Sequence, residues 1–424
     1  MNRYERIIRR LRQPIDVRRA FARIARRTEF LIIVVGVGLR LFNYVQNRPY
    51  WLDEQSLASS LVGCPILSFA APLANTQLVS PGFLAVERVV STILGDSRPA
   101  MRLYPLVCGI ASIFWFREVA SRCLSARAAL IALTLFTFSS DLIYYSTELK
   151  QYSGDVAIGL VCTSAALVAS ERLSASRAAF LLATAALAPW FSHPSAFMIA
   201  GLGATLAVGK LLEKRWKEAT FVAAAGAVAG LSFLGSYVLS MMLLDSRPKM
   251  WAFWDFAFLR LPPRSRSDLS ILGFQLSEAL VNPLDMIFSL MPVISAMFVS
   301  IMIGAGVVVL AGRKPATLAM IVLPILLTAF ASGARRYPFH GRLLLFLVPS
   351  IDLLVAAGAD ALGRRTGRTF LARTLVVLVL AQPILSAANL QFSPPVRSFN
   401  RYGDFHEAVF SAPDEKPKEL IHPK

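Results

Sequence analysis

Two adjacent carboxylates, Asp53 and Glu54, follow the first long apolar run of the chain. The aromatic residues Tyr50 and Trp51 come directly before them. Such side chains gather at the headgroup layer of a membrane, so they predict that the acidic pair lies at that depth. A carboxylate there is suited to act as a general base on an acceptor hydroxyl or amine, and we assign both residues to catalysis. The alternative interpretation is a pair of solvated loop charges at a helix end.

A second polar stretch, residues 144–153, reads YYSTELKQYS. Glu148 and Lys150 carry opposite charges and are two positions apart, so they would not share a helix face. One of them could face the acceptor and the other a phosphate. We therefore assign Glu148 to catalysis, and Lys150 and Tyr152 to substrate binding. The alternative is an ordinary polar loop with interfacial tyrosines.

A third group lies late in the chain, where residues 335–342 read RRYPFHGR. Arginine binds phosphate through a planar fork of donors, and such donors stabilise charge that develops on a phosphate leaving group. We assign Arg335, Arg336, His340 and Arg342 to substrate binding. The alternative partner for these arginines is the headgroup layer of the bulk lipid.

Few other residues are candidates for binding a substrate or a metal ion. His193 precedes a proline at an expected turn between two helices, and we include it among the substrate-binding residues, although a lone histidine there is commonly structural. Asp53 and Glu54 could together bind a divalent cation, but no third oxygen ligand is evident. The four cysteines show neither metal-site nor disulfide spacing. No metal site is therefore assigned, and no cofactor is firmly implied.

The composition places all these residues in a membrane protein. Hydrophobic residues make up 55% of the 424 positions and charged residues only 17%, against about 25% in soluble domains. The apolar runs recur from end to end, which is typical of an all-α polytopic membrane protein. The net charge of +18 would indicate nucleic acid in a soluble protein. Here much of it lies in short loops, where membrane topology and anionic lipid account for it.

We expect about eleven transmembrane helices. They are the runs 29–46, 101–119, 127–145, 155–171, 177–192, 195–212, 218–243, 284–311, 315–332, 341–362 and 370–388. With the N-terminus inside, every expected inner loop is basic and nearly free of acid, as the positive-inside rule requires. The apolar stretch 78–94 would break this alternation if it crossed the membrane. We therefore place it in the first outer loop as a juxtamembrane helix.

Three segments follow from this topology. Residues 1–28 are a basic cytoplasmic segment, either an amphipathic helix on the membrane surface or a solvated tail that fixes orientation. Residues 29–388 form one transmembrane domain, and residues 389–424 form a short periplasmic tail. The expected location is the cell inner membrane, with the N-terminus cytoplasmic and the carboxylate pair periplasmic.

The order of these motifs resembles a known family. An aromatic-Asp-Glu group, then SPGF, RPAMRLYP, STELKQYS and finally YPFHGR follow one another along the chain. This order is similar to that of the GT-C superfamily of membrane glycosyltransferases. The nearest group contains the protein O-mannosyltransferases and the bacterial lipid A aminoarabinose transferases. The resemblance covers about residues 29–390.

The resemblance implies a GT-C fold, a polyprenyl-phosphate sugar as donor and an inverting transfer to a glycan, lipid or protein. It implies that Asp53 is the base, that Lys150 and Arg342 bind the donor phosphate, and that Glu148 helps to hold the acceptor or Asp53. This chain lacks the large soluble C-terminal domain of the many-helix members, so the resemblance does not identify the acceptor.

Two other functions are open from the sequence. A transporter or flippase of lipid-linked sugars would also need outer arginines, but transporters usually place polar groups at mid-membrane. Few charges lie deep in these runs, and Arg40 is the exception. A non-catalytic partner in polysaccharide assembly is the third possibility, and no motif favours it.

Overall fold

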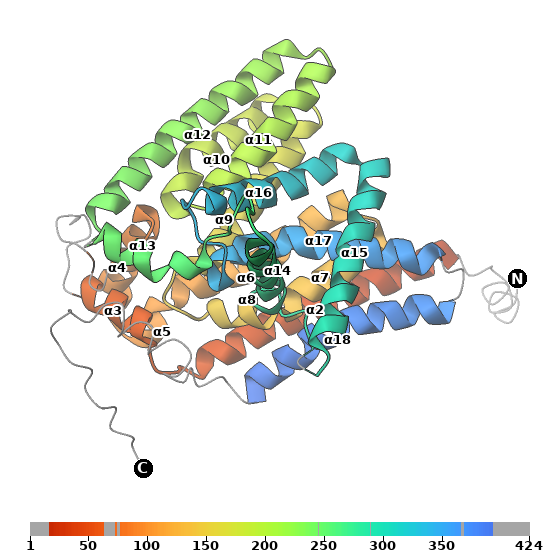
Figure 1. The fold of residues 1–424 in the computed structure, drawn as a ribbon, viewed down its shortest axis with the longest axis horizontal. Coiled ribbons are helices and arrows are strands. Elements are labelled where there is room, and N and C mark those ends of the chain that lie inside the picture. Colours follow the sequence, from red (N-terminus) through yellow and green to blue (C-terminus); the bar gives the residue numbers. More distant parts are fainter. Residues whose placement is uncertain are drawn as a thin grey trace, which may run out of the picture.

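The fold consists of helices packed side by side, with short helices gathered at one end (Figure 1). The computed structural model describes residues 17–62, 73, 77–244, 246–288, 290–365 and 369–392. Most of the predicted basic segment and most of the predicted tail lie outside these ranges. Within them the named elements are all helices, so the all-α prediction is confirmed.

The long helices correspond to the predicted spans. Nine segments of the described chain are long and apolar enough to cross a membrane, and two shorter apolar helices accompany them. The helices concerned are α2 (Val17–Val45), α6 (Leu103–Cys123), α7 (Ala126–Phe138), α9 (Tyr152–Ser170), α10 (Ala175–Phe191), α11 (Ser195–Leu212), α12 (Trp216–Met242), α15 (Pro292–Arg313), α16 (Pro315–Gly333), α17 (Val348–Arg365) and α18 (Thr369–Phe392). Each predicted run coincides with one of them.

Some boundaries differ from the prediction. The run 127–145 is divided at Ser139, whose hydroxyl accepts a hydrogen bond from the amide of Leu142 and so caps a separate helix, α8 (Ser140–Tyr145). The run 284–311 becomes helical only at Pro292, because proline is suited to the first turn of a helix. The run 341–362 opens with a 3-10 turn, η2 (Gly341–Leu347). Breaks of this kind depend on local capping, which hydropathy does not report.

Helix α17 is the centre of the bundle. In Gly341–Arg365, the segment made of η2 and α17, 89% of the residues in its apolar stretch are buried, whereas the share in the other candidate spans is 61% or less. Two glycines allow α15 and α17 to touch backbone to backbone. A Cβ atom on Gly306 would lie 2.1 Å from the carbonyl oxygen of Leu354, and one on Gly358 would lie 1.9 Å from that of Met302. Small residues at such crossings are typical of membrane helix pairs.

The predicted inner loops gather at one end of the bundle. Lys314 Nζ donates to the backbone carbonyls of Arg122 and Cys123, at 3.2 and 3.0 Å. Arg122 forms an ion pair with Glu171 at 3.1 Å. The loops after α6, α9 and α15 therefore share one end, as the alternation of charged loops requires.

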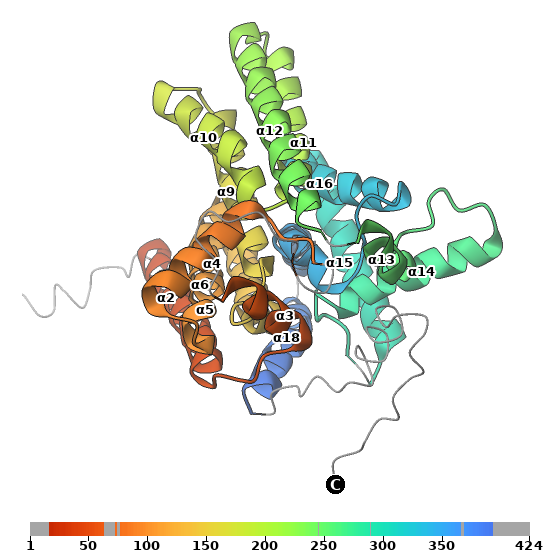
Figure 2. The ribbon, with the colours of Figure 1, turned by 90° about the vertical axis from the view of Figure 1, so that its left-hand side faces the viewer.

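The short helices form the opposite end. They are α3 (Leu52–Leu61), α4 (Pro81–Leu94), α5 (Arg98–Met101), α13 (Arg247–Phe253) and η1 (Asp255–Ala257). In Figure 2 the group α3 to α5 lies on one side and α13 on the other, and α14 (Arg266–Val281), which lies nearer the middle of the bundle in Figure 1, extends beyond α13. Helix α4 is the juxtamembrane helix predicted at 78–94, and it is not among the candidate spans.

Candidate active site

Asp53 and Arg342 meet at the end that carries the short helices. Asp53 lies in the first turn of α3, and Arg342 lies in η2 directly after Gly341, whose φ of +50° favours glycine. The two side chains form an ion pair although they are 289 positions apart. They are 12% and 18% exposed, which is enough to reach a ligand.

Lys150 joins this pair from a third segment, the loop before α9. Its side chain is buried and donates a hydrogen bond to Oε1 of Gln77. Burial lowers the pKa of Lys150, and the nearby Asp53 carboxylate opposes that shift. The structure thus brings together a carboxylate and two cations that the sequence placed in three separate motifs.

A cavity of about 470 Å³ opens at these residues. The predicted site residues that line it are Asp53, Lys150, Tyr152, His193, Arg336 and Arg342. The Arg342 guanidinium also lies 5.4 Å from the ring centroid of Tyr152, in a cation–π contact. Aromatic residues also line the cavity, and they are Phe197, Phe233, Tyr237, Trp251, Phe253, Trp254 and Phe258. The lining therefore combines charged and apolar side chains.

The other predicted site residues are not among those that line this cavity. Arg335 forms an ion pair with Asp255 on the surface. His340 packs edge-on against Phe256, with 5.2 Å between the ring centroids. Glu148 is fully buried in the loop that ends at Lys150. Glu54 is also fully buried, and its carboxylate lies at the centre of a hydrogen-bond network.

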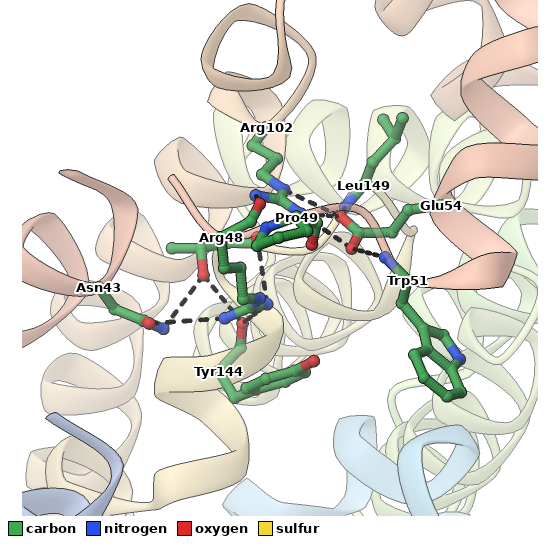
Figure 3. A network of polar contacts seen from close by, with 9 residues as sticks. Asn43, Arg48, Pro49, Trp51, Glu54, Arg102, Tyr144 and Leu149 are labelled. Atoms are coloured by element: carbon green, nitrogen blue, oxygen red, sulfur yellow. Dashed lines mark hydrogen bonds and ion pairs between the residues drawn. The ribbon is translucent and has the colours of Figure 1, made fainter. Parts of the chain in front are cut away.

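The Glu54 network connects the start of α3 with Arg102, between α5 and α6, and with the loop before α9 (Figure 3). Arg102 donates to the carboxylate through Nε and Nη2, each at 2.9 Å. The backbone amides of Leu149 and Trp51 donate at 2.8 and 3.0 Å. A carboxylate with four such donors is held firmly, so Glu54 positions Asp53 beside it and the loop that carries Lys150. We propose this positioning role for Glu54.

Arg48 and Asn43 hold the same loop from the end of α2 (Figure 3). Arg48 donates to the carbonyl oxygens of Tyr144 and Thr147 at 3.1 and 3.2 Å, and it lies 3.7 Å over the Tyr144 ring. Asn43 donates to the hydroxyl of Thr147 at 3.0 Å and to the carbonyl of Ile143 at 3.2 Å. Sequence reasoning missed Asn43, Arg48 and Arg102 because nothing in their spacing shows which loop they contact.

Sequence reasoning also missed three features of the cavity. They are Gln151 and Asp155, which line it from the start of α9, and the aromatic lining residues from α11, α12 and the segment 251–258. The four-residue spacing of Gln151 and Asp155 was a usable sign, because such residues share a helix face. A second usable sign was the position of Asp155, because acidic residues at the beginning of a membrane span are rare and commonly functional.

The acidic pair does not fit a divalent metal. Asp53 faces Arg342, whereas the carboxylate of Glu54 is occupied by Arg102 and two amides, so the two groups do not converge on one point. In the ranges that the structure describes, no group of three or more His, Cys, Asp or Glu side chains could hold a metal ion.

Comparisons with known proteins agree with the fold. No protein-family model and no curated protein sequence matches the chain. The crystal structure of the Archaeoglobus fulgidus oligosaccharyltransferase in complex with Zn and sulfate is similar, with a TM-score of 0.57 and 13% identity over 93% of this chain and 59% of that one. ArnT from Cupriavidus metallidurans has a TM-score of 0.48 and 14% identity over 89% of this chain and 76% of that one.

A second structure from Archaeoglobus fulgidus, the oligosaccharyltransferase AglB in complex with an inhibitory peptide and a dolichol-phosphate, has a TM-score of 0.50. Its identity is 10%, over 93% of this chain and 61% of that one. This chain therefore spans about six tenths of the length of the oligosaccharyltransferases that it matches. Its helical fold is similar to that of these oligosaccharyltransferases, in agreement with the fold class that the order of its motifs predicted.

Proposed function

We propose that the chain is an inverting glycosyltransferase that moves a sugar from a polyprenyl-phosphate donor to a glycan, lipid or protein acceptor. The observation that carries this proposal is the convergence of Asp53, Lys150 and Arg342 at one cavity. A base and two cations in one place match the needs of transfer from a phosphate. The neighbouring oligosaccharyltransferase fold supports the same class of reaction.

The chemistry follows from the charges. The acceptor oxygen or nitrogen attacks the anomeric carbon while the bond from that carbon to the phosphate oxygen breaks, which inverts the configuration. Asp53 takes the proton from the acceptor as general base. The phosphate leaves as an anion, and Arg342 and Lys150 stabilise the charge that develops on it. One carboxylate is sufficient because a phosphate leaves without being protonated, unlike the leaving group of a glycosidase.

The surroundings of the cavity suit a lipid chain. A second groove of about 330 Å³ lies along α10, α11 and α12, and it is lined mainly by alanine, glycine and other apolar side chains. It shares Ala196 and Phe233 with the charged cavity. A prenyl chain in this groove would deliver its phosphate to Lys150 and Arg342. We place the reaction at the periplasmic face of the cell inner membrane, with the N-terminus cytoplasmic, because the basic loops gather at the opposite end.

Transfer of sugar by the purified protein tests this function. The protein in detergent, supplied with synthetic polyprenyl-phosphate sugars and candidate acceptors, should release polyprenyl phosphate and form a glycosidic bond. Detergent removes the sealed compartment that a flippase requires. Movement of the lipid-linked sugar across sealed vesicles, without transfer under any donor and acceptor combination, would instead favour the transporter.

Removing the Arg342 side chain should weaken donor binding. The Arg342→Ala variant loses the charged fork and leaves the Asp53 carboxylate beside the phosphate without its cation. Hydrogen bonds to charged groups contribute about 1.5–3 kcal/mol, so we expect a Kd for the donor about 10- to 100-fold higher. Arg335→Ala is the matched control, since Arg335 is exposed and paired with Asp255. Equal effects of the two substitutions would contradict the assignment.

Donor binding should also depend on the charge of Lys150. The protonated side chain attracts phosphate, so binding is complete below the pKa of Lys150 and declines as the pH rises through it. Burial lowers this pKa, and the decline should therefore begin at a lower pH than for an exposed lysine. Lys150→Arg keeps its charge at all accessible pH values and should remove the decline. The measurement is the donor Kd from neutral to alkaline pH. Identical profiles for the two proteins would exclude Lys150 as the titrating group.

A further inference from the structure

Besides the charged residues, other polar residues line the cavity, and the proposed transfer chemistry does not use them. Gln151, Asp155 and His193 line it, the first two from the start of α9 and the third from the turn between α10 and α11. The backbone amide of Asp155 donates to the carbonyl of Gln151 at 2.8 Å, so their side chains lie one helical turn apart on the same face.

Two acceptor atoms of these residues have no hydrogen-bond partner among the described residues. They are Oδ1 of Asp155 and Oε1 of Gln151. Asp155 is buried, with only 6% of its surface exposed. The Ser192 hydroxyl lies near its carboxyl group. The Gln151 amide nitrogen donates to the carbonyl of Leu78 at 3.2 Å, which fixes the orientation of the side chain. Buried acceptors without donors are costly and mark a place for a ligand that brings donors.

His193 presents a further acceptor. Its Nε2 lies 3.3 Å from Oγ of Ser236 and 3.2 Å from Oγ of Ser240. Each hydroxyl has a single proton, and these protons go to the carbonyl oxygens of Pro189 and Val79, at 2.8 and 2.9 Å. We assign the ring proton to Nε2, because both serine hydroxyls have carbonyl acceptors close by and their oxygens can accept from the ring. Burial lowers the pKa of His193 to about 4, so the ring is neutral at neutral pH and its Nδ1 is an acceptor.

We propose that Gln151, Asp155 and His193 form a sugar-recognition subsite that accepts hydrogen bonds from hydroxyl or amino groups of the donor sugar. This proposal rests on the proposed function and adds the chemistry of the sugar to it. The lining then offers groups of two kinds: cations bind the phosphate, and acceptors bind the ring. A site built from buried acceptors rejects an analogue whose donors are blocked, because the acceptors are then left unpaired. The subsite therefore selects a sugar with free hydroxyl or amino groups.

The test compares lipids that differ only in the sugar. The full-length protein in nanodiscs is titrated with polyprenyl phosphate alone and with polyprenyl phosphate that carries glucose, glucosamine or permethylated glucose. The wild type should bind the glucose or the glucosamine lipid about tenfold more tightly than the sugar-free and the permethylated lipids. A preference for glucosamine over glucose would identify an amino group as the main donor, and the reverse a hydroxyl.

Substitutions then assign the preference to the subsite. Asp155→Asn should reduce it, because a donor amide replaces one acceptor oxygen, while the Kd for sugar-free polyprenyl phosphate changes by less than about twofold. Gln151→Met is the second variant and should reduce the preference. Asp285→Asn is the matched control, because Asp285 is a half-buried acid that Ser140 and Ser386 already satisfy and that is not among the cavity-lining residues.

The outcomes separate this inference from the proposed function. It is overturned if the wild type shows no preference for a sugar-bearing lipid, or if the preference survives both Asp155→Asn and Gln151→Met. A loss of affinity for every lipid alike in Asp155→Asn would also overturn it, since that is the effect of a structural residue. Sugar-dependent binding without transfer would support the subsite and contradict the proposed transferase activity.

Discussion

Asp53→Asn should reduce the rate of sugar transfer about 100- to 10,000-fold, the usual contribution of a general base. Asparagine has nearly the shape of aspartate but cannot take the proton from the acceptor. The phosphate-binding cations stay in place, so the Kd for the donor should not rise, and the loss should appear in kcat. The measurement is single-turnover transfer from a synthetic polyprenyl-phosphate sugar, with donor binding followed separately.

Two comparisons make the Asp53 experiment decisive. Asp255→Asn is the control, because Asp255 is an exposed acid paired with Arg335 on the surface near the cavity. Asp53→Glu keeps the carboxylate and should retain more activity than Asp53→Asn. If purified Asp53→Asn transferred sugar at nearly the wild-type rate, Asp53 would not be the base and the proposed mechanism would have to be abandoned.

The second large effect concerns stability. Arg102→Met leaves the buried Glu54 carboxylate without its cation, and breaking a buried ion pair in this way costs about 3–5 kcal/mol. Thermal unfolding in detergent should shift strongly to lower temperature. Transfer should fall as well, because the Glu54 network holds both Asp53 and the amide of Leu149 next to Lys150.

The matched control lies on α6, the helix that begins directly after Arg102. Arg117 of α6 pairs with Glu29, but its side chain is 46% exposed. Exposed ion pairs contribute about 0–1 kcal/mol, so Arg117→Met should hardly change the unfolding temperature. If the Arg102→Met and Arg117→Met proteins unfolded at the same temperature, the Glu54–Arg102 pair would not hold the start of α3 to the segment between α5 and α6.

The spans and their order were predictable, because they depend on properties that accumulate along the chain. A run of apolar residues has to cross the bilayer, and basic loops fix the side on which each run ends. The division of one run at Ser139 and the 3-10 opening of another at Gly341 depend on single capping or turn residues. A hydropathy sum over many positions does not detect the effect of one capping or turn residue.

The candidate site was predictable in part for a similar reason. Asp53, Lys150 and Arg342 carry charges that a membrane protein rarely places without a partner, so their types alone made them candidates. Glu54 looked equivalent to Asp53 in the sequence. Consecutive residues on a helix point in different directions, and α3 turns one carboxylate to the cavity and the other to Arg102. The different roles of Asp53 and Glu54 can be predicted only if this segment is known to be a helix. The short polar sequence did not show that it is one.

The long separation between Asp53 and Arg342 has a consequence for biosynthesis. The two groups are 289 positions apart, so the ribosome has made most of the chain before they can meet. The first helices enter the bilayer with an incomplete reaction centre. Under the proposed function, a nascent chain cannot consume a lipid donor before η2, which carries Arg342, has been made and has met α3.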